Sequence, residues 1–192
     1  MKDAKYLAAY LLPLSAAAAL YWQGGWAWAT VLLAFVIIPV VEIFTPESTE
    51  NVTPEQESVR TGIGFFDWLL YLNIPMVFGL VFWYLKVMSN TALTIPEITG
   101  LTLGIGNNLG ANGINVAHEL GHRSRRSEQF LSKLLLLPTL YQHFFIEHNR
   151  GHHKNVATDK DSASAQFGQV VYIFWLRCGE VGEAPGRSSG NG

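Results

Sequence analysis

The feature that most constrains this chain is a stretch of 36 residues, 6–41, that contains no Asp, Glu, Lys or Arg. A soluble fold rarely leaves so long a stretch uncharged, because some of its residues must face water. The composition agrees, since 49% of the 192 residues are hydrophobic and only 15% are charged. The sequence therefore predicts an all-α integral membrane protein.

Four apolar segments are long enough to cross a bilayer as helices, which takes about 20 residues each. They cover residues 6–22, 26–44, 68–85 and 98–117. A shorter apolar stretch, 134–146, would reach only about 20 Å as a helix. That length predicts a re-entrant or interfacial helix rather than a crossing, so the segments before and after it stay on one face of the membrane.

The fourth predicted span is unusual because glycine and asparagine recur along it. Gly100 with Gly104, and Gly106 with Gly110, each form a GxxxG pattern, which allows two helices to approach closely. The span also contains Asn107, Asn108, Asn112 and Asn115. Amides facing lipid are costly, so we expect this helix inside the bundle, where its asparagines either pack against neighbouring helices or line a cavity.

Basic residues gather on one side of the predicted membrane. With the N-terminus in the cytosol, the outer side has only Lys86, and the inner side has Lys2, Lys5, Arg60, Arg123, Arg125 and Arg126. We therefore expect a multi-pass protein in the lipid bilayer with its N-terminus cytosolic. The net charge of −2 argues against nucleic-acid binding. The single cysteine, Cys178, excludes an intrachain disulfide framework.

All six histidines lie between positions 118 and 153. His118 and His122 stand four residues apart in HELGH, which places both imidazoles on one face of a helix. His148 and His152 repeat this spacing in EHNRGHH, and His153 follows directly. Five imidazoles exceed what one zinc ion with an open position needs, so the pattern indicates more than one metal.

Other readings of these residues remain open. HELGH also fits HExxH, the signature of zinc metalloproteases, in which Glu119 would be the general base. An intramembrane zinc protease would need a further acidic ligand, and EHNRGHH supplies too many histidines for that chemistry. The sixth histidine, His143, is interpreted as an interfacial or hydrogen-bonding residue.

Two longer segments resemble a known family. NGINVAHELGHRSRR and HFFIEHNRGHHKNVATDKDSASAQFG are similar to the membrane-bound non-haem di-iron alkane monooxygenases, also called alkane hydroxylases. Hydropathy agrees with that family over residues 1–170, so we expect this range to be the N-terminal portion of such a membrane domain. Xylene hydroxylases and membrane fatty-acid desaturases use similar histidine boxes and remain alternatives.

The resemblance implies a site and a reaction. The iron ligands would be His118, His122, His148, His152 and His153, holding two non-haem irons at the cytosolic face of a bacterial inner membrane. Glu119 and Glu147 would orient imidazoles through their N–H groups, and Asp159 and Asp161 would either do the same or cap loops. One atom of O₂ would enter the terminal C–H bond of a medium-chain alkane, giving a primary alcohol. Rubredoxin and its reductase would supply the electrons.

The chain also departs from the family pattern. Further histidines in NYxxHYG-like and HSDHH-like segments do not occur here. Residues 171–192 are expected to be a divergent, disordered tail, low in apolar residues and rich in Gly and Ser after Arg177. These departures predict a fragment or an early frameshift whose di-iron site is incomplete. A non-catalytic remnant with a partial metal site is the corresponding alternative.

Overall fold

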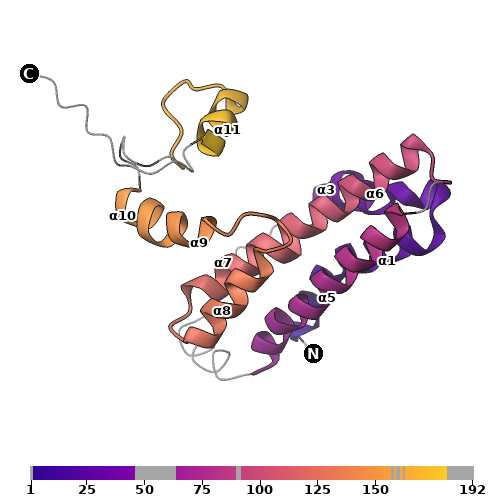
Figure 1. Ribbon diagram of the computed structural model, residues 1–192, viewed down its shortest axis with the longest axis horizontal. Coiled ribbons are helices and arrows are strands. Elements are labelled where there is room, and N and C mark those ends of the chain that lie inside the picture. The colour runs from indigo at the N-terminus through magenta and orange to yellow at the C-terminus, as the bar shows by residue number, and fades with distance from the viewer. Residues whose placement is uncertain are drawn as a thin grey trace, which may run out of the picture. The chain divides into compact units, whose positions relative to one another are not determined.

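The computed structural model of the protein describes residues 2–45, 64–89, 92–156, 158, 161, and 163–180. Within these residues every regular element is a helix, which confirms the all-α prediction (Figure 1). The chain divides into two compact units, Met1–Leu140 and Tyr141–Gly192. Arg60, Asp159 and the side chains of Lys2 and Lys5 lie outside the part that the structure describes.

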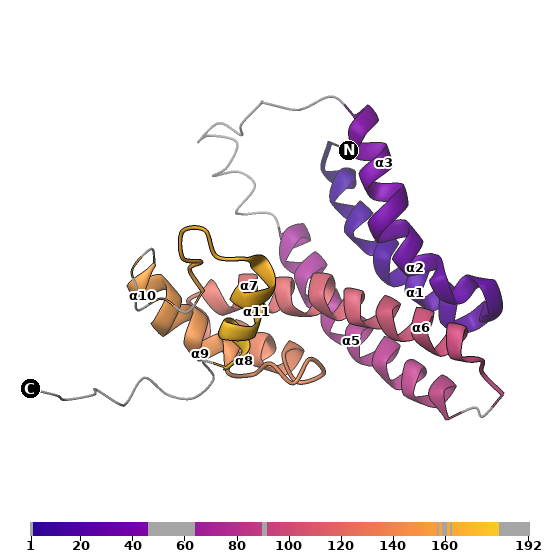
Figure 2. The same ribbon diagram turned by 90° about the horizontal axis from the view of Figure 1, so that it is seen from above.

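The first unit consists of long helical segments that lie side by side (Figure 2). A 3₁₀ helix, η1 (Lys2–Tyr10), leads into α1 (Leu11–Trp22). The second segment comprises η2 (Gly24–Trp28), α2 (Ala29–Leu32), η3 (Leu33–Ile37) and α3 (Ile38–Phe44). The remaining elements are α5 (Gly64–Met88), α6 (Ile95–Asn108), the π-helical turn η4 (Leu109–Ile114), α7 (Asn115–His122) and α8 (Arg126–Leu135).

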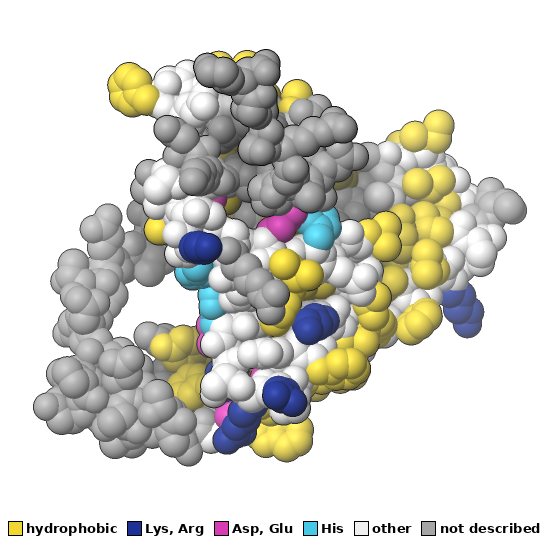
Figure 3. Space-filling model, turned by 60° about the vertical axis from the view of Figure 1, so that its left-hand side comes forward, with side chains coloured by type: hydrophobic (Ala, Val, Ile, Leu, Met, Phe, Trp, Pro, Cys, Tyr) yellow, Lys and Arg dark blue, Asp and Glu magenta, His cyan; other side chains and the backbone are white. Residues whose placement is uncertain are grey.

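All four predicted spans are helical in the structure. Two helices, Gly24–Phe44 and Gly64–Met88, are long and apolar enough to cross a membrane, and Tyr6–Trp22 is a shorter apolar helix. Large apolar side chains are also exposed on their surfaces, among them Phe35 and Phe44. Figure 3 shows hydrophobic side chains, in yellow, gathered on one face of the molecule. Such exposure is expected where lipid replaces water as the solvent. All four membrane crossings remain predictions.

The glycine patterns of the fourth segment behave differently from each other. A Cβ atom at Gly100 would lie 2.9 Å from the Ala27 carbonyl oxygen, and one at Gly104 would lie 3.1 Å from Thr30 Cβ. This pair therefore lets α6 approach η2 and α2 closely, as predicted. Gly106 and Gly110 have no such neighbour within 4 Å among the described residues. The prediction of close packing at the second pair was wrong, because this face of the helix is open.

The turn between the first two segments is bound to the start of α6. Thr94 and Glu97 form a capping box, in which the Thr94 N–H donates to Glu97 Oε2 at 2.8 Å. The other carboxylate oxygen, Oε1, accepts the Gly24 N–H at 2.8 Å. Hydrogen bonds from the Thr94 side chain and backbone, and then from Gly24, lower the pKa of Glu97. The α1–η2 turn and the α6 N-terminus therefore share one end of the unit.

The opposite end of the unit collects the chain start, the start of α5 and the end of α7. Tyr6 meets Phe66 edge to face with ring centroids 5.4 Å apart, and Tyr10 donates its hydroxyl hydrogen to the Leu69 carbonyl. Arg123, just after α7, pairs with Asp67 of α5. The helical segments thus alternate in direction, as a chain that crosses repeatedly requires.

The asparagines of the fourth segment mostly face inward. Asn108 and Asn112 are buried, and Asn112 Nδ2 donates to Asn73 Oδ1 of α5 at 3.0 Å. Among the described residues, the Nδ2 atoms of Asn107 and Asn108 are buried without a hydrogen-bond partner. Asn115 is exposed, so the expected inward placement was wrong for that residue. The Asn112–Asn73 bond shows that at least one of these amides serves in packing between helices.

The predicted helix at residues 134–146 is not continuous. α8 ends at Leu135, and turns replace the helix from residue 136 to residue 143. Pro138 lacks the N–H that a helix interior needs, and Leu140 has φ 54°, in the left-handed region. α8 packs against α7, because the Ser132 hydroxyl donates to the Ala117 carbonyl at 2.5 Å. The apolar stretch is therefore part of a helix–turn hairpin.

The second unit contains two helical stretches. The first comprises α9 (Phe144–Ile146), the π-helical turn η5 (Glu147–His152) and α10 (His153–Asn155). The second is α11 (Val171–Glu180). Disorder was expected from residue 171, but the apolar run VYIFWL opens this helix. The rest of the expected tail, 181–192, lies outside the described residues.

Candidate metal centre

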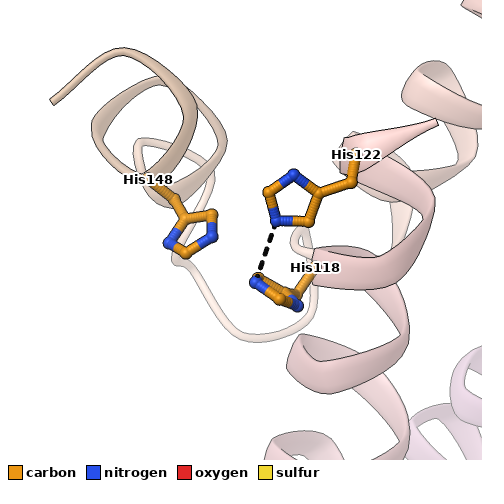
Figure 4. Close-up of side chains that lie close together, drawn as sticks. All are labelled: His118, His122 and His148. Carbon is orange, nitrogen blue, oxygen red and sulfur yellow. Dashed lines mark hydrogen bonds between the residues drawn. The ribbon is translucent and has the colours of Figure 1, made fainter. Parts of the chain in front are cut away.

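His118 and His122 form a close pair on α7 of the first unit. Their Nε2 atoms are 3.0 Å apart, and their rings stand nearly perpendicular, at 86° (Figure 4). Figure 4 also draws His148, which belongs to the second unit. The i, i+4 spacing of HELGH thus places both imidazoles on one face of the helix, as the sequence predicted, with their Nε2 atoms in contact.

The pair lies on the outer face of an amphipathic helix. Ala117, Leu120 and Gly121 are buried, whereas His122 is exposed and His118 is half-buried. The helix ends at His122 because Arg123 adopts an extended conformation, with ψ 149°. The buried face fixes α7 in the unit, and the opposite face presents both imidazoles.

The second histidine group pairs differently from the prediction. His148 Nε2 lies 3.0 Å from His153 Nε2, five residues along the chain, and the two rings stand at 84°. His152 stacks on His148 instead, with ring centroids 5.5 Å apart at 25°. The predicted i, i+4 pairing assumed an α-helix, but η5 is a π-helix, in which hydrogen bonds run from i to i+5. The wider turn therefore changes which histidine faces His148.

His152 is held by a buried carboxylate. Its Nδ1 lies 2.9 Å from Asp161 Oδ2, and Asp161 is only 3% exposed. Burial alone would raise the pKa of Asp161, but hydrogen bonds from the Ser164 hydroxyl, the Ala163 N–H and His152 outweigh it and lower that pKa. An ionised carboxylate at Nδ1 favours the tautomer with its proton there, which leaves the Nε2 lone pair available to a metal. Asp161 thus both caps a loop and orients an imidazole.

The two glutamates predicted to orient imidazoles have other partners. Glu119 Oε1 lies 3.7 Å from the Arg123 guanidinium, and Glu147 Oε2 lies 3.8 Å from His143 Nε2. His143 also meets the Tyr141 ring edge to face, with ring centroids 4.6 Å apart, and its interfacial or hydrogen-bonding role stays a prediction. Among the described residues Asp161 contacts a clustered histidine, His152, which is one of the two roles that the sequence left open for it.

The spacing of the paired nitrogens can be compared with metal geometries. A metal–imidazole bond is about 2.1 Å long, so two nitrogens 3.0 Å apart would subtend about 90° at a shared ion. A tetrahedral ion would place the same atoms about 3.4 Å apart. Two nitrogens at this separation are close enough to bind one ion together. Imidazole suits iron as well as zinc and copper, so the donor set fits iron.

A known family model matches the part of the chain that contains both histidine boxes. Residues 92–179 match the family model described as Fatty acid desaturase, so the match includes all five clustered histidines and extends past residue 170. This part of the chain is therefore similar to that family.

The chain is also similar to several curated monooxygenases. The chain is 34% identical over 148 residues to the alkane 1-monooxygenase of Acinetobacter baylyi, and the aligned part covers 76% of this chain and 36% of that protein. It is 36% identical over 131 residues to the alkane 1-monooxygenase of Ectopseudomonas oleovorans, covering 67% and 31%. The xylene/toluene monooxygenase hydroxylase component of Pseudomonas putida is 27% identical over 173 residues, covering 86% and 44%.

These matches confirm the predicted resemblance to alkane monooxygenases. The chain spans less than half the length of each of these three relatives.

Proposed function

We propose that this chain is the first histidine-bearing part of a membrane-bound alkane monooxygenase. The reaction would convert a medium-chain alkane, O₂, two electrons and two protons into a primary alcohol and water. The observation that carries the proposal is the pair of 3.0 Å Nε2–Nε2 contacts, formed by both predicted histidine boxes of a chain similar to alkane 1-monooxygenases. Rubredoxin and its reductase are the proposed electron donors.

The chain's own residues would divide the work of holding two irons. The five proposed ligands are His118, His122, His148, His152 and His153. The irons supply the activation of O₂ when bound. Asp161 keeps the His152 proton on Nδ1, so the ring can coordinate through Nε2. Glu119 and Glu147 remain proposed as supports outside the ligand set, through Arg123 and His143.

The proposal also includes how the chain is placed in the membrane. We propose four crossings with the N-terminus and both histidine boxes at the cytosolic face of the bacterial inner membrane. The alternating direction of the helical segments and the Tyr6, Asp67 and Arg123 contacts at one end support this arrangement. A bilayer would also deliver an alkane that water does not dissolve. Residues 171–192 are proposed to lie outside the membrane domain.

The centre is proposed to be incomplete in this chain, because five neutral imidazoles cannot fill the coordination of two irons. Iron analysis of the purified 192-residue chain should find fewer than two irons per chain. Octane hydroxylation with added rubredoxin and reductase should be undetectable. Two irons per chain together with turnover would contradict this part of the proposal. No iron retention, even after reconstitution with Fe²⁺, would favour the non-catalytic remnant.

Three alternatives differ in measurable ways. A xylene hydroxylase is favoured by the match to the xylene/toluene monooxygenase component, and a lipid desaturase by the family model. Screening the chain in membranes against octane, xylene and acyl lipids would separate the alkane monooxygenase from these two alternatives. A zinc protease would bind zinc rather than iron, and Glu119→Gln would abolish its peptidase activity.

A further inference from the structure

The end of α7 carries a charge cluster centred on Arg123. Arg123 follows His122 directly, and its guanidinium contacts three carboxylates from three helices. Nη1 lies 2.5 Å from Asp67 Oδ1 of α5 and 3.2 Å from Glu128 Oε1 of α8, and Nη2 lies 3.7 Å from Glu119 Oε1 of α7. Arginine suits such a role, because its planar fork offers five donors in fixed directions.

Glu128 makes this cluster more than a surface ion pair. Its side chain is only 4% exposed, whereas that of Arg123 is 28% exposed. Its Oε1 also accepts the Tyr71 hydroxyl of α5 at 2.8 Å. A carboxylate so deeply buried needs a cation and hydrogen bonds beside it. Arg123 and Tyr71 supply them, so the contacts of Glu128 tie the start of α8 to α5.

The helix with the first histidine pair is held between these contacts. Gln129 Nε2 donates to the Arg123 carbonyl at 3.0 Å, and Ser132 donates to the Ala117 carbonyl, one residue before His118. Arg123 thus binds α5 through its side chain and α8 through both its side chain and its carbonyl. The rotation and depth of the exposed His118–His122 face depend on these attachments.

We propose that Arg123 is a positioning residue, which fixes the His118–His122 pair through Asp67 and Glu128. The inference rests on the proposed metal role of that pair. Supporting residues around a metal site typically change its affinity 10- to 100-fold. Arg123→Gln removes the cation, leaves Glu128 buried without it and frees the α7 terminus from α5.

The test uses the purified 192-residue chain in detergent, with Co²⁺ as the probe. Its absorption bands report both affinity and the geometry of the nitrogen ligands. Arg123→Gln should weaken Co²⁺ binding by about tenfold and shift the bands. Arg123→Lys, which keeps the charge but loses the fork, should recover part of the affinity. The matched control is Arg125→Gln, which removes an equal charge from an exposed side chain two residues away and should change affinity less than twofold.

A second readout does not depend on metal. Amide hydrogen exchange across residues 115–122 should accelerate in Arg123→Gln and stay unchanged in Arg125→Gln. If the wild-type chain binds no Co²⁺, the metal function fails, and exchange alone decides on positioning. Equal exchange in the two variants would then overturn it.

If wild type does bind Co²⁺, identical affinity and bands in Arg123→Gln and Arg125→Gln would overturn the positioning role while the metal function stands. Arg123→Gln could also fail to fold. Asp67→Asn, which keeps the side-chain shape at a partly exposed position, then decides instead. An affinity loss of about threefold supports the role, and wild-type behaviour in affinity and exchange refutes it.

Discussion

Alanine substitutions at Gly100 and Gly106 should differ in stability, because only the first of the two GxxxG patterns in the fourth segment is closely packed. A Cβ atom at Gly100 would lie 2.9 Å from a backbone oxygen, that of Ala27, and 3.0 Å from Trp28 Cδ1. The backbone cannot move aside as a flexible side chain could, so α6 and η2 must separate by a few tenths of an ångström. A Cβ atom at Gly106 meets nothing within 4 Å among the described residues.

The difference in the free energy of unfolding between the two variants follows from the neighbours of each glycine. Both substitutions gain the same helix propensity, about 1 kcal/mol, and this gain cancels when the two variants are compared. The remaining term is overpacking at Gly100, which typically costs about 1–3 kcal/mol. Gly100→Ala should therefore be less stable than Gly106→Ala by that amount.

The free energy of unfolding can be measured by titrating SDS into the chain in mild detergent, with helicity read by circular dichroism. Gly110→Ala is a second control at an open position, because a Cβ atom there also meets nothing within 4 Å among the described residues. A difference below about 0.5 kcal/mol between Gly100→Ala and both controls would refute the close approach of α6 and η2.

Three further predictions concern single contacts. Asp161→Asn should weaken Co²⁺ binding about tenfold, because it removes the charge that orients His152, and an unchanged titration would contradict this. Ser132→Ala should cost about 1 kcal/mol in the free energy of unfolding, by loss of a buried hydrogen bond, whereas exposed Ser127→Ala should cost almost nothing. Since the folded pKa of Glu97 is lowered, its stabilising effect should be present above the unfolded pKa and vanish as pH falls through the folded one. Wild type and Glu97→Gln should then converge in acid, and a gap that widens would contradict the sign.

Apolar length predicted the helical segments well because it depends only on composition. The 36-residue uncharged stretch and the three-residue Gln-Gly-Gly turn located α1 and the segment that begins at η2. Gly100 and Gly106 look equivalent in sequence, since each begins a GxxxG pattern. Only the path of the neighbouring segment shows that one is packed and the other open.

The histidine pairs show a different limit. HELGH could be interpreted correctly because α7 is a regular α-helix where the pair lies. EHNRGHH has the same i, i+4 spacing, but its π-helical turn brings His153 rather than His152 to His148. A π turn depends on backbone hydrogen bonds that residue type hardly indicates. Asp161 could be found only as one of two candidate acids, because its contact with His152 depends on how the loop folds back.

The hydrogen bond between Gly24 and Glu97 has a consequence for how the protein is made. Its donor and acceptor are 73 residues apart in the chain. At about 5–20 residues per second, a ribosome needs roughly 4–15 seconds to travel from one to the other. The first helical hairpin is therefore made several seconds before the N-terminus of α6, and during that time the Gly24–Glu97 hydrogen bond cannot form. The hydrogen bond to this turn thus forms late in biogenesis. A nascent chain that is stalled before residue 97 should leave the turn accessible to protease, whereas a longer nascent chain should protect it.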